Sequence, residues 1–173
     1  MIKLFDEFIN EAENYLSESA DYTPEDIYNM AVQLKDNGSV KDVKQIKSGW
    51  GPKGFCFEMY YSKGLICKFD FVNKYEYIYE YRTNDENTIG NGSTNEIDRT
   101  DWEVTLNAVK HINSLISNLT AGVKRASGNE KRYYNAYNRS NKSSDYEKYL
   151  KEKKWVEIWN KRIARYRELL AFA

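Results

Sequence analysis

The sequence is poor in residue types that carry chemistry, with one histidine and two cysteines among 173 residues. The histidine, His111, stands between Val109 and Ile112 on an expected helix, with no cysteine or acidic pair nearby at metal-ligand spacing. A lone histidine in that setting is more often a packing residue than a ligand or a general base. We therefore expect no catalytic residue, no metal site and no cofactor.

The two cysteines, Cys56 and Cys67, lie on two expected strands that are joined by a turn at residues 62–64. Pairing them directly would centre that turn between Tyr61 and Ser62, a register that the glycine at position 64 disfavours. Neither cysteine is expected near a helix N-terminus or a cation that would activate it. We expect two free, reduced thiols.

Long apolar runs are also absent, and none approaches the roughly 18 residues that cross a bilayer. The N-terminal segment carries acidic residues among its apolar ones, so it lacks the apolar core of a secretory signal. The chain is close to the usual size of one domain. These features predict a soluble, single-domain protein that is neither secreted nor bound to a membrane.

Glycine and carboxylate patterns give weak indications of a site. The segment 49–54 contains three glycines and a lysine, but it lacks the Walker spacing and the hydroxyl residue after lysine. Asp85 with Glu86, or Glu76 with Glu80, could in principle hold Mg²⁺ or act as an acid–base pair. A turn and a solvated acidic surface are the favoured interpretations.

The first half of the chain predicts two helices followed by strands. Residues 2–17 form an amphipathic pattern, and a second helix begins after Thr23 and ends at Asn37-Gly38. Apolar residues then alternate through 55–61, 65–71 and 75–81, with a weaker strand at 40–47. We expect a three- or four-stranded antiparallel meander. Its tyrosine row 75/77/79/81 could stack nucleic-acid bases, but packing against helices is favoured.

The second half predicts helices. Residues 83–99 are expected to form an exposed loop, and Thr100 with Glu103 is expected to form a capping box. The following helix should bury Trp102, Leu106, Val109, Ile112, Ile116 and Leu119. Residues 124–144 fit a helix or a loop. A last helix, 145–171, repeats Tyr149, Val156, Ile163 and Leu170 every seven residues, with Trp159 and Tyr166 between them, as in a helix-packing seam.

The fold class expected from these patterns is α+β. The division expected is an N-terminal segment, 1–17, and a single domain, 18–173, whose C-terminal third is basic and helical.

Charge is distributed unevenly although it sums to zero. Residues 1–100 hold 11 Lys and Arg against 18 Asp and Glu, whereas residues 101–173 hold 15 against 8. Attraction between the two halves is the favoured explanation, and a nucleic-acid surface is the alternative. The candidate contacts to nucleic acid or another partner are Arg132, Lys151, Lys154, Lys161 and Arg165.

The first twelve residues, MIKLFDEFINEA, carry the most specific motif of the chain. They resemble the capsid-targeting peptide of internal head proteins in T-even-type tailed bacteriophages, through Lys3, Phe5, Glu7, Phe8, Ile9, Glu11 and Ala12. The resemblance implies targeting through Phe5, Phe8 and Ile9. It also implies proteolytic processing at Ile9, Glu11 and Ala12, with cleavage after Glu11.

The resemblance predicts a phage virion protein that is packaged in the head interior beside DNA and ejected with it into the host cytoplasm. Its partners would then be scaffold or capsid proteins, DNA through nonspecific phosphate contacts, and a host protein. Two alternatives stay open. One is another phage-encoded interaction protein, such as a capsid, neck or tail component or an inhibitor of a host defence enzyme. The other is a small nucleic-acid-binding protein or enzyme.

Overall fold

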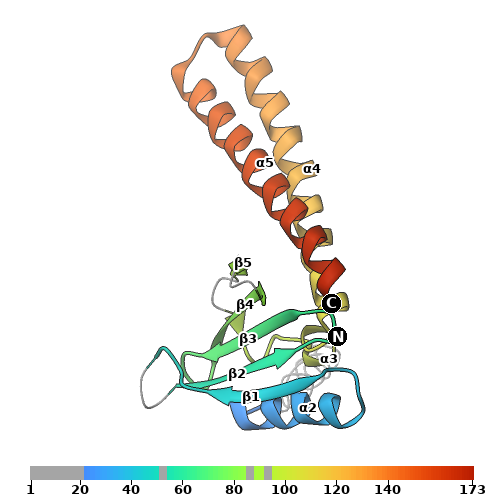
Figure 1. Cartoon of the computed structure of the whole chain (residues 1–173). Helices are drawn as coiled ribbons and strands as arrows, with labels where there is room; N and C mark the ends of the chain where they lie inside the picture. Colours follow the sequence, from blue (N-terminus) through green and yellow to red (C-terminus); the bar gives the residue numbers. More distant parts are fainter. Residues whose placement is uncertain (1–21, 51–53, 85–87, 92–94) are drawn as a thin grey trace, which may run out of the picture.

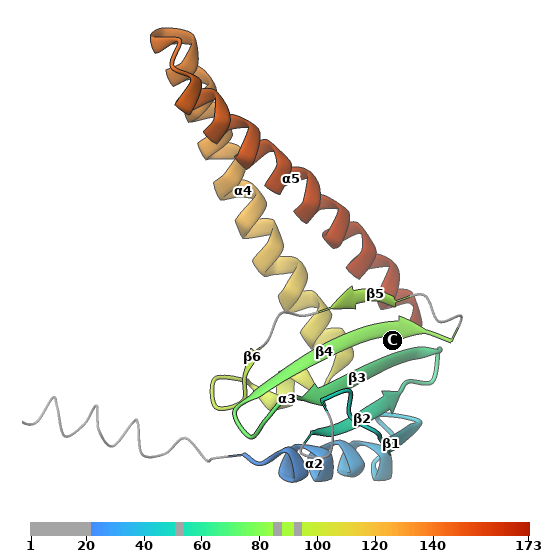
Figure 2. The same cartoon turned by 90° about the vertical axis from the view of Figure 1, so that its left-hand side faces the viewer.

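The computed structural model describes residues 22–50, 54–84, 88–91 and 95–173. It has an antiparallel sheet with helices on one face and a long helical hairpin that extends away from the sheet (Figures 1 and 2). The α+β class and the order of helix, meander and C-terminal helices are therefore confirmed. No helix in the described part of the chain is both long and apolar enough to cross a membrane.

The sheet begins as a four-stranded meander of β1 (Asp42–Ile46), β2 (Phe55–Tyr60), β3 (Leu65–Phe71) and β4 (Glu76–Thr83). All neighbouring pairs are antiparallel. Met59 lies opposite Cys67, and Cys56 lies opposite Asp70, so the two cysteines are on opposite faces of the sheet. Both thiols are free, as expected.

The segment expected to be an exposed loop, 83–99, instead adds two short strands to the sheet. Strands β5 (Thr88–Asn91) and β6 (Asn95–Glu96) both pair with β4, and Ile97 is fully buried next to them. The exposed-loop prediction is therefore wrong for these residues. The free edge of β4 supplies backbone partners that the local composition of the segment does not reveal.

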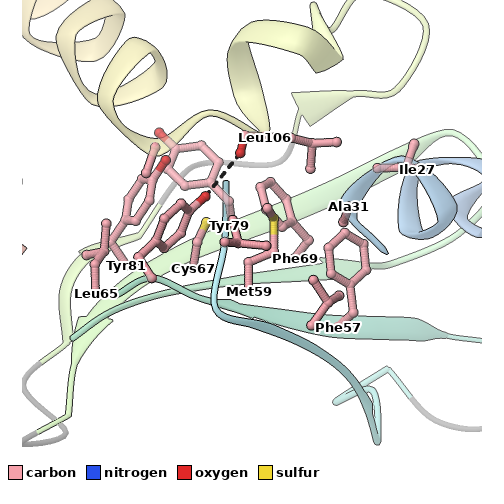
Figure 3. Packing of buried hydrophobic residues seen from close by; sticks show 14 of the residues in the cluster. Ile27, Ala31, Phe57, Met59, Leu65, Cys67, Phe69, Tyr79, Tyr81 and Leu106 are labelled. Atoms are coloured by element: carbon pink, nitrogen blue, oxygen red, sulfur yellow. Dashed lines mark hydrogen bonds between the residues drawn. The ribbon is translucent and has the colours of Figure 1, made fainter. Parts of the chain in front are cut away.

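The core lies on the face of the sheet formed by the alternating aromatic residues of β2, β3 and β4. Helix α2 (Pro24–Asp36) covers part of it with Ile27 and Ala31 (Figure 3), and helix α3 (Trp102–Thr105) inserts Trp102. The Trp102 ring is 4.8 Å from the Tyr77 ring, between centroids. Tyr77, Tyr79 and Tyr81 are all buried, so they are packing residues, while Tyr75 precedes the strand and is exposed.

The expected capping box does not form. Asp101 is the residue that caps α3, with its carboxylate accepting a hydrogen bond from the Val104 amide at 3.0 Å. The Thr100 hydroxyl is used elsewhere, since it donates to the Glu96 carbonyl oxygen at 2.7 Å. Helix α3 ends after one turn and Asn107 caps a new helix, so Val109 is exposed instead of buried. Ile112 is buried, and Ile116 and Leu119 are half-buried against the core.

Candidate nucleic-acid interface

The hairpin consists of α4 (Ala108–Ser140) and α5 (Ser143–Leu169), which is followed by a 3₁₀ turn, η1 (Leu170–Phe172). Residues 124–144, whose sequence fits either a helix or a loop, are thus helical through Ser140. Asn141 reverses the chain in the left-handed conformation, with φ of 52°. The Ser140 hydroxyl donates to the Ala136 carbonyl and approaches Asp145 on the next helix, which closes the turn.

The predicted seam on α5 faces α4. Ile163 and Tyr166 are buried, and Tyr149, Val156, Trp159 and Leu170 are half-buried. Trp159 packs against Gly122, where an added Cβ would lie 3.0 Å from the indole ring. Farther from the sheet, Tyr137 meets Tyr146 and Tyr134 meets Tyr149, at centroid distances of 5.0 and 5.3 Å. The two helices therefore stay paired from Gly122 and Trp159 to the turn.

The base of the hairpin is fixed in the core. The Tyr81 hydroxyl is 2.7 Å from Nδ1 of His111 at the start of α4, and Leu169 at the end of α5 is fully buried. Because both helices are anchored at the same end, their far ends extend away from the sheet (Figure 2). At 1.5 Å per residue, α4 is about 50 Å long.

Four predicted contact residues form one exposed row, which we call the basic stripe: Lys151, Lys154, Lys161 and Arg165. Helical geometry places Lys154, Lys161 and Arg165 on the side of α5 opposite the seam and Lys151 at the edge of that side, over about 21 Å in all. Arg132 lies instead on α4. Its guanidinium is 4.8 Å from the Tyr133 ring centroid and donates to the Tyr133 hydroxyl at 2.9 Å. The structure thus groups four of the five predicted residues and separates the fifth.

The charge on the hairpin is not neutralised by ion pairs with other residues that the structure describes. Residues 108–173 hold 15 Lys and Arg against 6 Asp and Glu, a net charge of +9. Every ion pair that joins two described residues lies within residues 35–99. We expected attraction between the acidic residues of 1–100 and the basic residues of 101–173, but no ion pair between described residues joins these two halves. The hairpin presents its positive charge to solvent.

The residues considered for catalysis lie in settings that suppress reactivity. Burial lowers the pKa of His111 to about 4, so its imidazole is neutral at pH 7. Burial, with a smaller effect of Asp70, raises the pKa of Cys56 to about 12, and burial also raises the pKa of Cys67. All three groups are therefore uncharged and enclosed, which suits packing better than acid–base or nucleophilic chemistry.

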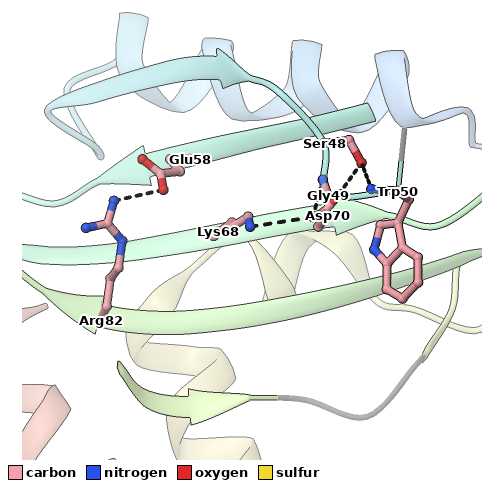
Figure 4. Close-up of polar contacts among 7 residues, drawn as sticks. All are labelled: Ser48, Gly49, Trp50, Glu58, Lys68, Asp70 and Arg82. Atoms are coloured by element: carbon pink, nitrogen blue, oxygen red, sulfur yellow. Dashed lines mark hydrogen bonds and ion pairs between the residues drawn. The ribbon is translucent and has the colours of Figure 1, made fainter. Parts of the chain in front are cut away.

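The outer face of the sheet holds a polar network (Figure 4) and a pocket of about 250 Å³ beside Trp50. The Asp70 carboxylate there accepts hydrogen bonds from the Ser48 hydroxyl at 2.6 Å and the Gly49 amide at 3.2 Å. Lys68 forms an ion pair with the same carboxylate at 3.5 Å. Asp70 therefore fixes the turn at Gly49 and Trp50, in agreement with the turn predicted there.

The predicted carboxylate pairs do not assemble into a metal site within the described residues. Glu76 and Glu80 lie on the same face of β4, as expected, and the Glu76 carboxylate is 3.4 Å from the side-chain amide of Asn73. No group of three or more His, Cys, Asp or Glu side chains that could hold a metal ion is found in the part of the chain that the structure describes. Asp85 and Glu86 lie outside that part.

The residues of the phage-like peptide also lie outside the described residues. These are the targeting residues Phe5, Phe8 and Ile9, and the processing residues Ile9, Glu11 and Ala12. Comparison of the chain with protein-family models, with curated proteins and with solved structures finds no match. The hairpin and the peptide are therefore the two features from which a function can be argued.

Proposed function

We propose that this chain is a non-enzymatic phage virion protein that is packaged in the head and contacts nucleic acid through its helical hairpin. The observation that carries the nucleic-acid part is the exposed positive charge on a long projection from the sheet, which forms no ion pair between described residues. Neutralising phosphates with Lys and Arg releases counterions and gives affinity that does not depend on sequence. Such binding suits a protein that lies beside densely packed DNA.

The basic stripe gives the proposal a direct test. Charge reversal at Lys151, Lys154, Lys161 and Arg165 is expected to abolish retention on duplex DNA at low salt. Retention of the unchanged protein is expected to fall steeply as salt rises, because each phosphate contact adds about 0.9 to the slope of log affinity against log salt. All four side chains are exposed, so the variant should keep its fold.

A matched control separates a specific surface from total charge. The same number of reversals is placed at exposed lysines in and next to β1 and in the turn between β2 and β3: Lys41, Lys44, Lys47 and Lys63. This control changes net charge equally and is expected to keep most of the DNA retention. Equal weak binding by all three proteins would contradict the proposed interface and leave the stripe as a solvated helix surface.

The head location rests on the N-terminal peptide and has its own test. If the peptide is a targeting tag, mass spectrometry of the purified phage particles should find a chain that begins at Ala12. Deletion of residues 1–11 should leave the melting temperature nearly unchanged, because a targeting tag binds a partner and a protease and does not pack in the core of its own domain. A particle-bound chain that retains residues 1–11 would contradict cleavage, and unfolding on deletion would show that the segment belongs to the domain.

A further inference from the structure

One flank of the hairpin carries a second row of positive charge that comes from α4. Arg125, Arg132 and Arg139 recur every seven residues, so they lie on nearly the same side of the helix at intervals of about 10.5 Å. All three are exposed and form no ion pair with a described residue. Gly128 lies between two of them, and a Cβ there would meet nothing within 4 Å. The row is therefore open to a ligand.

Helix α5 adds to the same flank. The Lys148 ammonium lies 5.6 Å from the centroid of the Tyr133 ring, and the Arg132 guanidinium lies 4.8 Å from it. Because both cations meet on one ring, Arg132 and Lys148 are on the same side of the helix pair. Lys151 and Trp155 follow Lys148 by three and seven residues and continue along this side of α5. We call these six residues, Arg125, Arg132, Arg139, Lys148, Lys151 and Trp155, the arginine face.

Trp155 is the unusual member of this face. Its ring stacks on Trp159, with 5.5 Å between centroids and 30° between planes, and Trp159 is itself packed against Gly122. Trp155 is nevertheless 41% exposed. The indole is thus held in place from one side by Trp159, while much of its surface stays exposed.

The chemistry of this face is that of a single-strand binder. Unpaired bases stack on aromatic side chains while cations track the phosphates, and the interaction tolerates any sequence. Bases inside a duplex are already stacked on both sides and offer no free ring to an indole on a helix surface. Two acidic side chains lie near this row on α5: Glu152, which is half-buried, and Glu147, which is exposed and lies four residues before Lys151.

We propose that the arginine face binds single-stranded nucleic acid, with Arg125, Arg132, Arg139, Lys148 and Lys151 contacting phosphates and Trp155 stacking on an unpaired base. This inference depends on the proposed nucleic-acid function of the hairpin and adds a preference for single strands. It also moves part of the interface from the outer side of α5 to the flank shared by both helices.

The test compares binding of a labelled oligothymidylate of about 20 nucleotides with binding of a duplex of equal length, by fluorescence anisotropy at low salt. The unchanged protein is expected to bind the single strand more tightly. Trp155→Ala should weaken single-strand binding by about 5-fold to 150-fold, the contribution of stacking one base, with duplex binding unchanged. Trp155→Phe keeps an aromatic ring at this position and should retain part of the affinity. It therefore separates the loss of base stacking from a loss of hairpin packing.

Two control proteins make the result specific. Tyr75→Ala removes another exposed aromatic residue, 57% exposed and beside the sheet, and should leave both affinities unchanged. Reversing Arg125, Arg132 and Arg139 together should weaken binding of both nucleic acids, because phosphate contacts are common to them.

The outcomes distinguish the two proposals. If the unchanged protein binds neither nucleic acid, the proposed function fails and this inference fails with it. If it binds both equally, or if Trp155→Ala binds the single strand like the unchanged protein, the inference alone is overturned. Binding to vesicles of anionic phospholipid without binding to either oligonucleotide would assign the face to a membrane surface and overturn both.

Discussion

Two glycines in α4 offer a measurement of how tightly the hairpin is packed. Gly122 and Gly128 are six residues apart in the interior of the same helix, so each alanine substitution carries the same intrinsic gain of about 1 kcal/mol. Their surroundings differ. A Cβ at Gly128 would meet nothing within 4 Å, whereas a Cβ at Gly122 would lie 3.0 and 3.2 Å from two carbons of the Trp159 ring.

The expected effects therefore have opposite signs. Gly128→Ala should realise the full gain of about 1 kcal/mol, which raises the melting temperature by about 2–4 °C in a protein of this size. Gly122→Ala must displace a ring that already stacks on Trp155, and overpacking of this kind costs about 1–3 kcal/mol. After the intrinsic gain is subtracted, we expect a net loss of roughly 1 kcal/mol.

The assay is urea unfolding followed by circular dichroism at 222 nm, which reports mainly on the two long helices. The expected order of stability is Gly128→Ala, then the unchanged protein, then Gly122→Ala. Adding Trp159→Ala to Gly122→Ala should remove the clash, so the two changes should couple by about 1–2 kcal/mol. If Gly122→Ala stabilised the protein as much as Gly128→Ala, the helices would not pack as described.

The remaining predictions concern buried titratable groups. Cys56 and Cys67 should not react with a thiol reagent in the native protein at pH 8, and both should titrate without reductant in urea; a mass lower by two protons would reveal a disulfide. Because the pKa of His111 is lowered from 6.5 to about 4 in the folded state, its contribution to stability is complete above pH 6.5 and is lost as the pH falls towards 4. The loss should approach roughly 3 kcal/mol, and His111→Gln should flatten the pH dependence of the free energy of unfolding over that range. An unchanged slope in this variant would assign the acid sensitivity to other groups.

Period-two alternation made the sheet predictable from the sequence. Phe57, Phe69 and Tyr79 are consecutive cross-strand neighbours on the core face. Each belongs to a strand in which every second residue is apolar, and this alternation identifies the buried face from the sequence. Strands β5 and β6 could not be predicted in the same way, because their Asn-, Thr- and Gly-rich residues pair with the edge of β4. Pairing of that kind depends on a distant strand and leaves little trace in local composition.

The helical state of residues 124–140 depends on tertiary contacts that a local pattern does not contain. Tyr137 is held by Tyr146 across the turn, and Gly122 admits the Trp159 ring from α5. The basic stripe was predictable because α5 carries a clear seven-residue repeat. The row of Arg125, Arg132 and Arg139 could not be recognised, because its seven-residue spacing has meaning only once α4 is known to be a helix through Ser140.

Burial is graded along the hairpin, and this grading has a dynamic consequence. Buried residues on α4 end at Ala126, and on α5 they begin at Ile163, so none of residues 127–162 is fully buried. Helices held by half-exposed rings open locally at lower free energy than helices held by a core. Amide hydrogen exchange should therefore be fastest at the turn near Asn141 and slow progressively towards the sheet. Opening from that end would separate the helices that carry the arginine face while leaving the core intact, so the projection can adapt its shape without unfolding the domain that supports it.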